Sequence, residues 1–152
     1  MKILFVCTGN CSRSPMAEAY FRHLCKQNKM EEVTCHSAGI KVEEESLPPE
    51  EAKEVMTSLG LNLDSHIPRQ ISEEIIADSD QIVAMDSTHL DFLSKKFKSA
   101  STDKTRLLLS ALGAEEDVDD PYSGDLATFQ ESFLTMMPAL ANLADRIMRS
   151  TQ

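Results

Sequence analysis

The beginning of the chain constrains the fold most, because a short apolar run leads directly into a helical pattern. Residues 3–6 are continuously apolar and include β-branched and aromatic side chains, which is typical of a strand buried on both faces of a parallel sheet. A polar, turn-forming segment follows at residues 8–10. From Ser14 onward apolar residues recur at intervals of three and four, and Pro15 stands where a helix accepts proline after a serine cap. These patterns predict a strand joined to a helix by a short loop.

Strand and helix patterns alternate along the rest of the chain. Further strands are predicted at residues 33–36, 81–85 and 106–109, and further helices at residues 50–59, 71–77, 90–97 and 126–147. The segment Ser37-Ala38-Gly39 is expected to end the second strand. Pro138 lies inside the last helix and lacks a backbone N–H donor, so we expect a kink or a break there. The alternation predicts an α/β fold in which helices cover both faces of a parallel sheet.

Length, charge and cysteine content exclude several classes of protein. A chain of 152 residues suits one domain, so we expect residues 1–152 to form a single domain. With 25 acidic and 15 basic residues, the net charge of -10 repels nucleic acids and anionic membrane surfaces. The apolar runs are too short for a signal peptide or a membrane span, and four cysteines in a chain of this size fit a reducing compartment. We expect a cytoplasmic monomer that binds neither nucleic acid nor membrane, and any anion site must be built locally.

Cys7 and Arg13 flank the predicted loop and are separated by five residues. In such a loop, successive backbone N–H groups and the free donors of the first helical turn converge and form a cradle for an anion. The guanidinium of Arg13 can grip two oxygens of that anion. The same donors stabilise a cysteine thiolate, and the hydroxyl of Ser14 can donate to it as well. The pattern predicts that Cys7 is a nucleophile directed at the central atom of a bound oxyanion.

Asp120 precedes Pro121 at the end of an acidic loop, residues 115–120. Cleavage of a phosphoester requires a proton for the departing oxygen, and a carboxyl group can deliver that proton and then deprotonate the attacking water. Proline restrains the backbone after the acid. Taken alone, an aspartate in such a loop is usually a solvated surface group. Asp120 becomes the candidate general acid only when the Cys7 loop and a family resemblance are both taken into account.

The low-molecular-weight protein tyrosine phosphatases have an active-site segment that resembles one in this chain, Phe5-Val6-Cys7-Thr8-Gly9-Asn10-Cys11-Ser12-Arg13-Ser14-Pro15-Met16-Ala17-Glu18. The likeness extends over nearly the whole chain, in the family's order, through Ser37-Ala38-Gly39, His66, Arg69-Gln70, Met85-Asp86 and Asp120-Pro121-Tyr122. The resemblance implies a three-layer fold with a four-stranded parallel sheet between helices. It also implies that the protein removes phosphate from phosphotyrosine in proteins or peptides through a phosphocysteine intermediate, without a metal or another cofactor.

The resemblance also implies roles for individual residues. Cys7 is the nucleophile, Arg13 binds the phosphate and Asp120 is the general acid and base. The residues that bind phosphate or substrate are Thr8, Gly9, Asn10, Cys11, Ser12, Arg13 and Tyr122. The hydrogen-bond network that supports the loop is formed by Asn10, Ser14, Ser37 and His66.

The chain departs from the family at two neighbouring positions. Ser12 stands where the family usually has its second cysteine, directly before the arginine, and Cys11 lies one residue earlier. In the family that second cysteine forms a reversible disulfide with the nucleophile and protects it from over-oxidation. We expect weaker recovery of activity after peroxide here, because the side chain of Cys11 should point to the pocket wall. Position 11 also bears on the substrate, since a bulky aliphatic residue there favours phosphotyrosine and threonine is associated with protein-arginine phosphatases.

Three alternatives to a tyrosine phosphatase follow from the same residues. A protein-arginine phosphatase is favoured by Cys11 and by an aromatic wall that is reduced to Tyr122, and the acidic residues 43–45 can pair with a guanidinium group. A thioredoxin-coupled arsenate reductase shares the loop but needs relay cysteines, which residues 80–92 lack; the two remaining cysteines are expected in the core. A non-catalytic phosphate-binding regulator is disfavoured because nucleophile, arginine and acid are all present.

Overall fold

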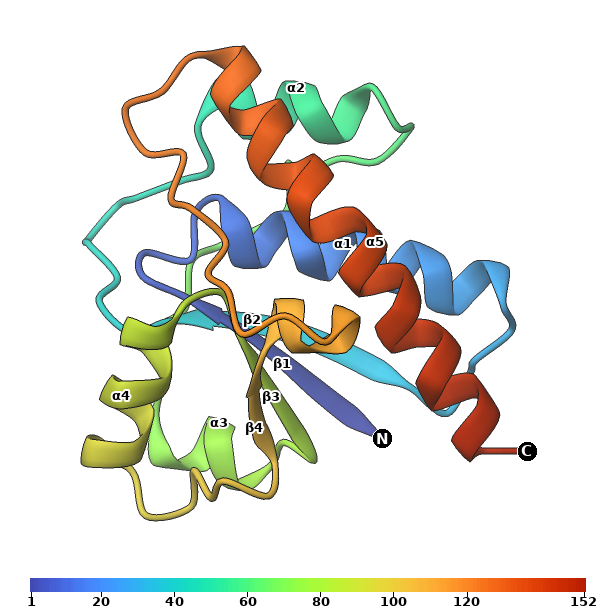
Figure 1. Cartoon of the computed structure of the whole chain (residues 1–152). Helices are drawn as coiled ribbons and strands as arrows, with labels where there is room; N and C mark the ends of the chain where they lie inside the picture. The colour runs from blue at the N-terminus through green and yellow to red at the C-terminus, as the bar shows by residue number, and fades with distance from the viewer.

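A parallel sheet lies at the centre of the molecule. The computed structural model describes all residues, Met1–Gln152, and its four strands are ordered β2-β1-β3-β4 (Figure 1). The strands are β1 (Lys2–Cys7), β2 (Thr34–Gly39), β3 (Gln81–Ala84) and β4 (Thr105–Leu107). The helices are α1 (Arg13–Gln27), α2 (Glu50–Thr57), α3 (Glu73–Ala77), α4 (Ser87–Lys96), α5 (Leu126–Ser150) and the short 3₁₀ helix η1 (Leu108–Leu112). The predicted α/β fold with a four-stranded parallel sheet is confirmed.

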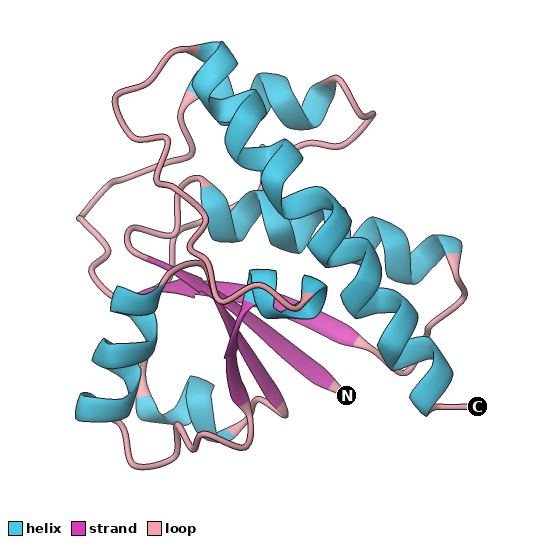
Figure 2. Cartoon of the chain, in the orientation of Figure 1, coloured by secondary structure: helices cyan, strands magenta, loops and turns pink.

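Helices cover both faces of the sheet, as Figure 2 shows. Ile3 and Phe5 of β1 belong to the core that contains residues of α1, α2 and α5, whereas Leu4 and Val6 belong to the core that contains residues of α3 and α4. All four side chains are fully buried. Burial on both faces therefore explains why this strand is a continuous apolar run rather than an alternating one.

The predicted boundaries of several elements were wrong by one to three residues. β2 continues through Gly39 instead of ending before it, because Cys7 at the end of β1 pairs with Gly39. α4 begins at Ser87 instead of residue 90, because the Asp86 side chain caps it and His89 completes a reciprocal capping bond. α3 begins two residues later than predicted, and the fourth strand is shorter because η1 replaces its second half.

The start of α1 differs from the prediction in a way that affects the site. The helix begins at Arg13, and its N-cap is Ser12, which forms no side-chain capping bond. Ser14 is therefore not the cap. It lies in the first turn of the helix, where its hydroxyl contacts the thiol of Cys7 at 2.9 Å.

Pro138 does not break α5, so of the kink or break predicted there, the break is contradicted. The helix runs without a gap from Leu126 to Ser150. Proline removes the backbone donor that would bond the carbonyl of Leu134, but Leu134 and Pro138 are both exposed, so water can hydrate that carbonyl. Buried side chains on both sides of the proline hold the two halves of α5 against the same core. Neither α5 nor any other helix is long and apolar enough to cross a membrane.

The topology brings three loops to the carboxyl edge of the sheet. β1 and β3 are neighbours, yet the helices that follow them, α1 and α4, pack on opposite faces (Figure 1). A crevice opens at such a reversal, and ligands of open α/β sheets bind there. The loop after β1 contains the predicted cradle, and the loops that follow β3 and η1 lie beside it.

Candidate active site

The loop between β1 and α1 turns from a strand end into a helix start within five residues, 8–12. Asn10 has a left-handed backbone, with φ of 55°, which asparagine tolerates better than most residues. Gly9 has no positive φ, and Asn10 is the one residue of this loop that does. The turn therefore depends on Asn10, whose side chain also forms hydrogen bonds that support the loop.

Gly39 at the end of β2 allows the loop to lie against the sheet. A Cβ atom on Gly39 would lie 2.7 Å from the carbonyl oxygen of Thr8 and 2.9 Å from the backbone nitrogen of Asn10. Just beyond, the backbone N–H groups of Ile40 and Lys41 donate to the carbonyl oxygens of Cys7 and Thr8 at 3.0 and 2.9 Å. Sequence reasoning treated Gly39 only as a strand end, but its missing side chain is what lets the loop approach.

A chain of side-chain hydrogen bonds runs from Asn10 to Cys7. The Asn10 Nδ2 group donates to the Ser14 hydroxyl oxygen at 2.8 Å, and that hydroxyl lies 2.9 Å from the Cys7 sulfur. Because Ser14 accepts from Asn10, its own proton is free to donate to Cys7. Asn10 is held in turn by the backbone N–H of Arg69 at its Oδ1 atom, 2.9 Å, and by His66 Nε2, which donates to its carbonyl oxygen at 2.7 Å. The chain of hydrogen bonds ends at the Cys7 sulfur, which faces a hydroxyl able to donate to it.

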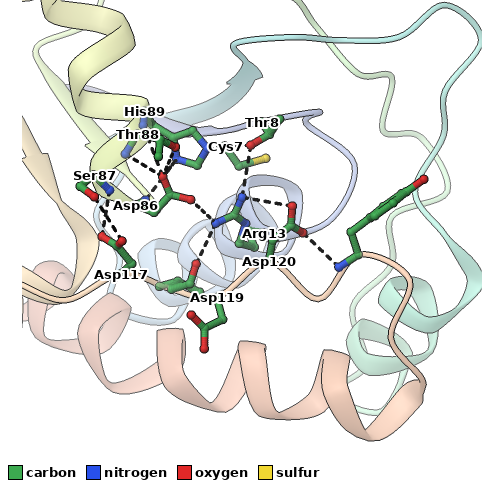
Figure 3. Close-up of polar contacts among 12 residues, drawn as sticks. Cys7, Thr8, Arg13, Asp86, Ser87, Thr88, His89, Asp117, Asp119 and Asp120 are labelled. Carbon is green, nitrogen blue, oxygen red and sulfur yellow. Dashed lines mark hydrogen bonds and ion pairs between the residues drawn. The ribbon is translucent and has the colours of Figure 1, made fainter.

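Arg13 is held by groups from three parts of the chain. Its side chain is only 2% exposed. The Nη1 atom donates to Asp86 Oδ2 at 2.8 Å and to the carbonyl oxygen of Val118 at 2.7 Å (Figure 3). The Nη2 atom lies 3.5 Å from Asp120 Oδ2 and 3.4 Å from the Thr8 hydroxyl. The guanidinium is thereby fixed in one orientation before any anion arrives.

Asp86 and His89 form a second support that sequence reasoning missed. His89 is fully buried, and burial lowers its pKa to about 4, partly opposed by the carboxylate of Asp86. The ring is therefore neutral at pH 7. Its Nδ1 atom accepts the backbone N–H of Asp86 at 3.1 Å, so its Nε2 atom carries the proton and donates to the Thr8 hydroxyl oxygen at 2.9 Å. The hydroxyl proton of Thr8 is left to donate elsewhere.

The pattern Asp86-Ser87-Thr88-His89 after an apolar strand was the available signal for this support. An Asp followed three residues later by a side chain that can bond back to its backbone is typical of a helix start. Because this pair follows a buried strand, the helix start lies at the carboxyl edge of the sheet. Hydrogen bonds from Thr88 and Arg13 outweigh the effect of burial and lower the pKa of Asp86, which therefore stays ionised beside the guanidinium.

Asp120 reaches the cradle from the acidic loop. Its side chain is 48% exposed, and its Oδ1 atom accepts the backbone N–H of Tyr122 at 3.1 Å. The loop is anchored upstream, because Val118 N–H donates to the carbonyl oxygen of Met85 at 2.8 Å and Asp117 accepts from Ser87. The fold thus places one carboxylate of this acidic loop beside Arg13 while another holds the start of α4.

A cleft of about 780 Å³ opens over the cradle. Its lining includes most of the predicted site residues: Cys7, Thr8, Gly9, Cys11, Ser12, Arg13, Asp120 and Tyr122. It also includes residues that sequence reasoning had not assigned: Lys41, Ser46, Leu47, Pro49, Glu51, Gly124 and Phe129. Their segments, after β2 and at the start of α5, are far apart in the sequence, so only the fold brings them together.

The four thiols have different surroundings. All are free, and Cys25 and Cys35 are buried in the core as expected. Burial raises the pKa of Cys35 to about 12 and raises that of Cys25 as well. Burial also raises the pKa of Cys11, against a hydrogen bond from Ser46. Cys11 therefore forms a neutral part of the cleft wall.

The predicted supporting network is present except for one member. Asn10, Ser14 and His66 are joined by the contacts described above. Ser37 is not part of that network, because its hydroxyl donates to the Glu18 carboxylate of α1. The strand register decides this, since Ser37 pairs with Phe5, two residues before the loop-facing end of β1.

The arrangement places the Cys7 thiol at the floor of a cleft beside the fixed guanidinium of Arg13, with the carboxyl group of Asp120 at the edge. The model of the low molecular weight phosphotyrosine protein phosphatase family matches residues 2–152. The chain belongs to this family. Its members include hydrolases that act on phosphorylated proteins, and this chain is such an enzyme.

Relatives of two kinds share this fold and length. The low molecular weight protein-tyrosine-phosphatase YfkJ of Bacillus subtilis is 36% identical over 126 residues, which cover 80% of this chain and 81% of the relative. A protein-arginine-phosphatase of Geobacillus stearothermophilus is 30% identical over 146 residues, which cover 96% of this chain and 95% of the relative. A solved structure of the YwlE arginine phosphatase, a C7S mutant with a phosphorylated active-site serine, superimposes with a TM-score of 0.90 at 28% identity and covers 97% of this chain and 96% of that chain.

Proposed function

We propose that the protein removes phosphate from phosphotyrosine in proteins, with Cys7 as nucleophile, Arg13 and the loop amides as phosphate ligands, and Asp120 as general acid and base. One observation carries the proposal: the Cys7 sulfur lies at the floor of the cleft, 2.9 Å from a hydroxyl whose proton is free to donate to it. A thiolate at this position attacks a phosphorus atom held above it. The family membership of the chain supports the same chemistry.

The first step forms a bond from the Cys7 sulfur to phosphorus and breaks the bond from phosphorus to the phenolic oxygen. Asp120 gives its proton to that oxygen, so that neutral tyrosine leaves. Negative charge builds on the three remaining phosphate oxygens, and Arg13 together with the backbone N–H groups of residues 8–12 stabilises it. Because Arg13 is already fixed by Asp86 and Val118, little reorganisation is needed at that moment.

The second step restores the thiolate. Asp120, now ionised, takes a proton from a water molecule while the water oxygen bonds to phosphorus, and the bond from phosphorus to sulfur breaks. Inorganic phosphate leaves, and the donor from Ser14 stabilises the thiolate that remains. A phosphorylated protein in which Cys7 carries the phosphoryl group is the expected intermediate, and acid quenching followed by mass spectrometry detects it.

A second candidate substrate is phosphoarginine. Cys11 is small, and the lining of the cleft includes the carboxylates of Glu43 and Glu51 besides Asp120, which suit a guanidinium group. The similarity over nearly the whole chain to a protein-arginine-phosphatase favours this candidate as well. The reaction keeps the same steps, except that the bond from phosphorus to nitrogen breaks and Asp120 gives its proton to that nitrogen.

The two substrates are distinguished by measuring kcat/KM on one peptide sequence that contains either phosphotyrosine or phosphoarginine. A higher value for the phosphotyrosine peptide supports the main proposal, and the reverse order replaces it by the second. Cys11→Ile narrows the cleft and should lower the value for phosphoarginine relative to phosphotyrosine. Cys25→Ser, a change of the same residue type in the core, should leave that ratio unchanged.

We further propose that residues 1–152 act as one catalytic domain and that it works in the cytoplasm. The two cores share the sheet and no linker divides them, which supports a single unit. A nucleophilic thiol and three further free cysteines suit a reducing compartment.

A further inference from the structure

A second cavity, of about 410 Å³, lies behind the phosphate loop and shares no residue with the active-site cleft. Its walls come from α1, from β2 and from the segment before α3. The charged and titratable residues that line it are Glu18, Arg22, His36, His66 and Arg69. Two guanidinium groups and two imidazoles therefore surround one carboxylate.

The single carboxylate is already committed. Glu18 forms an ion pair with Arg22 and accepts the hydroxyl of Ser37. The guanidinium of Arg69 forms no ion pair and no hydrogen bond within the chain; only its backbone N–H is used. In a protein of net charge -10, this cavity is a local site of excess positive charge.

His36 lies in the same cavity as Arg69. Burial lowers the pKa of His36, and the nearby guanidinium of Arg69 lowers it further, against the opposing effect of Glu18. An anion bound beside the two side chains would raise the pKa of His36, so the His36 ring is a sensitive reporter for this cavity.

The cavity is connected to the phosphate loop through two of its walls. His66 donates to the carbonyl oxygen of Asn10 at 2.7 Å, and the backbone of Arg69 donates to the Asn10 side chain at 2.9 Å. Asn10 has a left-handed backbone and begins the chain of hydrogen bonds that ends at Cys7. A ligand that orders His66 and Arg69 therefore acts on the residue that shapes the cradle.

We propose that this cavity is a second anion site, which takes a small molecule with a phosphate or carboxylate group between Arg22 and Arg69, and that its occupation changes the state of Asn10. The planar fork of arginine matches both kinds of oxyanion. The proposal does not depend on which phosphorylated residue the active site hydrolyses.

Titration with inorganic phosphate, followed by NMR, tests the proposal. The backbone amides of Gly9 and Ser12 report the cradle, whereas the His36 ring and the Arg69 side-chain N–H report the second cavity. We expect two dissociation constants, one for each set of signals. The Asn10 side-chain amide should respond at both. Acetate, added as a second probe, distinguishes a site for any oxyanion from one that requires phosphate.

Two substitutions are expected to change the dissociation constant for phosphate at this cavity in opposite directions. A disturbance of the fold would weaken binding in both variants. Arg22→Gln removes a cation, so the dissociation constant reported by His36 should rise about fivefold, as for roughly 1 kcal/mol. Glu18→Gln removes the only carboxylate, so the same constant should fall by a similar factor. Arg149→Gln, the same change on an exposed residue of α5, should alter neither constant.

The proposal is overturned if the His36 and Arg69 signals do not respond, or if they follow only the dissociation constant of the cradle. It is also overturned if Glu18→Gln fails to tighten binding at the His36 signal. If the Asn10 signal follows the cradle alone while His36 reports its own constant, the site exists but its link to the loop is refuted.

Discussion

The floor of the active-site cleft and its rim are built in opposite ways. On the floor, Arg13 and His89 are buried. Both terminal nitrogens of Arg13 and both ring nitrogens of His89 have hydrogen-bond partners. On the rim, Tyr122 is 83% exposed, Leu47 is 63% exposed, and the side chain of Asp120 is bound through one backbone N–H and a contact with Arg13. The difference indicates that buried side chains with fixed partners hold the phosphoryl group, whereas the group that carries the phosphate meets exposed, solvated side chains.

The largest effect is expected from Cys7→Ser at the floor. A hydroxyl is a far weaker nucleophile than a thiolate, so kcat on an aryl phosphate should fall by on the order of 10⁴-fold or more. Phosphate should still bind with a similar dissociation constant, because the donors of the cradle remain. Turnover comparable to the unchanged protein would refute the role of Cys7, and loss of phosphate binding would refute the rigidity of the floor.

Asp120→Asn tests the group between floor and rim. The amide cannot supply the proton, so kcat should fall by about 10²- to 10³-fold for a phosphotyrosine peptide. The loss should be smaller for an aryl phosphate whose leaving group is already acidic. Asp119→Asn is the matched control, since its carboxylate points away from Arg13 in Figure 3 and only its backbone carbonyl is bonded, by Ser132. Equal losses for both variants would contradict the assignment.

His89→Asn tests whether the floor depends on a neutral, buried imidazole. The pKa of His89 is about 4 in the folded protein and about 6.5 when unfolded, so below pH 6.5 the unfolded chain binds a proton that the folded one does not. The free energy of unfolding should therefore decrease as the pH falls from 6.5 to 4, with this group contributing roughly 3 kcal/mol to the decrease.

Urea unfolding at several pH values measures this contribution. His89→Asn should show a shallower fall over the same interval, while His23→Asn, the same change on α1, should follow the unchanged protein. An identical slope for His89→Asn and the unchanged protein would mean that His89 is not held neutral in the fold.

Tyr122→Ala should have the smallest effect, because it alters the rim alone. The free energy of unfolding should not change, since the side chain is almost fully exposed. KM for a phosphotyrosine peptide should rise about threefold to tenfold with kcat nearly constant, as for loss of one aromatic contact of about 1 kcal/mol. A large fall in kcat would show that the rim takes part in the chemistry. The distinction between a catalytic floor and a substrate-binding rim would then be wrong.

The parts of the site that could be predicted were those that lie close together in the sequence. Cys7, Arg13 and Ser14 belong to one strand, loop and helix, so their spacing, together with the strand and helix patterns on either side, indicated an anion cradle beside a thiol. The local pattern from Asp86 to His89 indicates a helix start, but their contacts with Arg13 and Thr8 were missed because these depend on β3 lying next to β1. Ser37 was placed in the supporting network by resemblance, and the register of β2 directs it to Glu18 instead.

The sequence by itself determined the order of strands and helices along the chain and predicted the thiol and the arginine of the loop, because each of these depends on local spacing and on side-chain chemistry. The candidate acid was predicted only with the help of the resemblance to the family. Only the tertiary structure decided which side chains hold Arg13, where Gly39 must lack a Cβ atom, and which distant residues form the rim and the second cavity. These depend on contacts between segments tens of residues apart, whose positions result from packing the whole chain around one sheet.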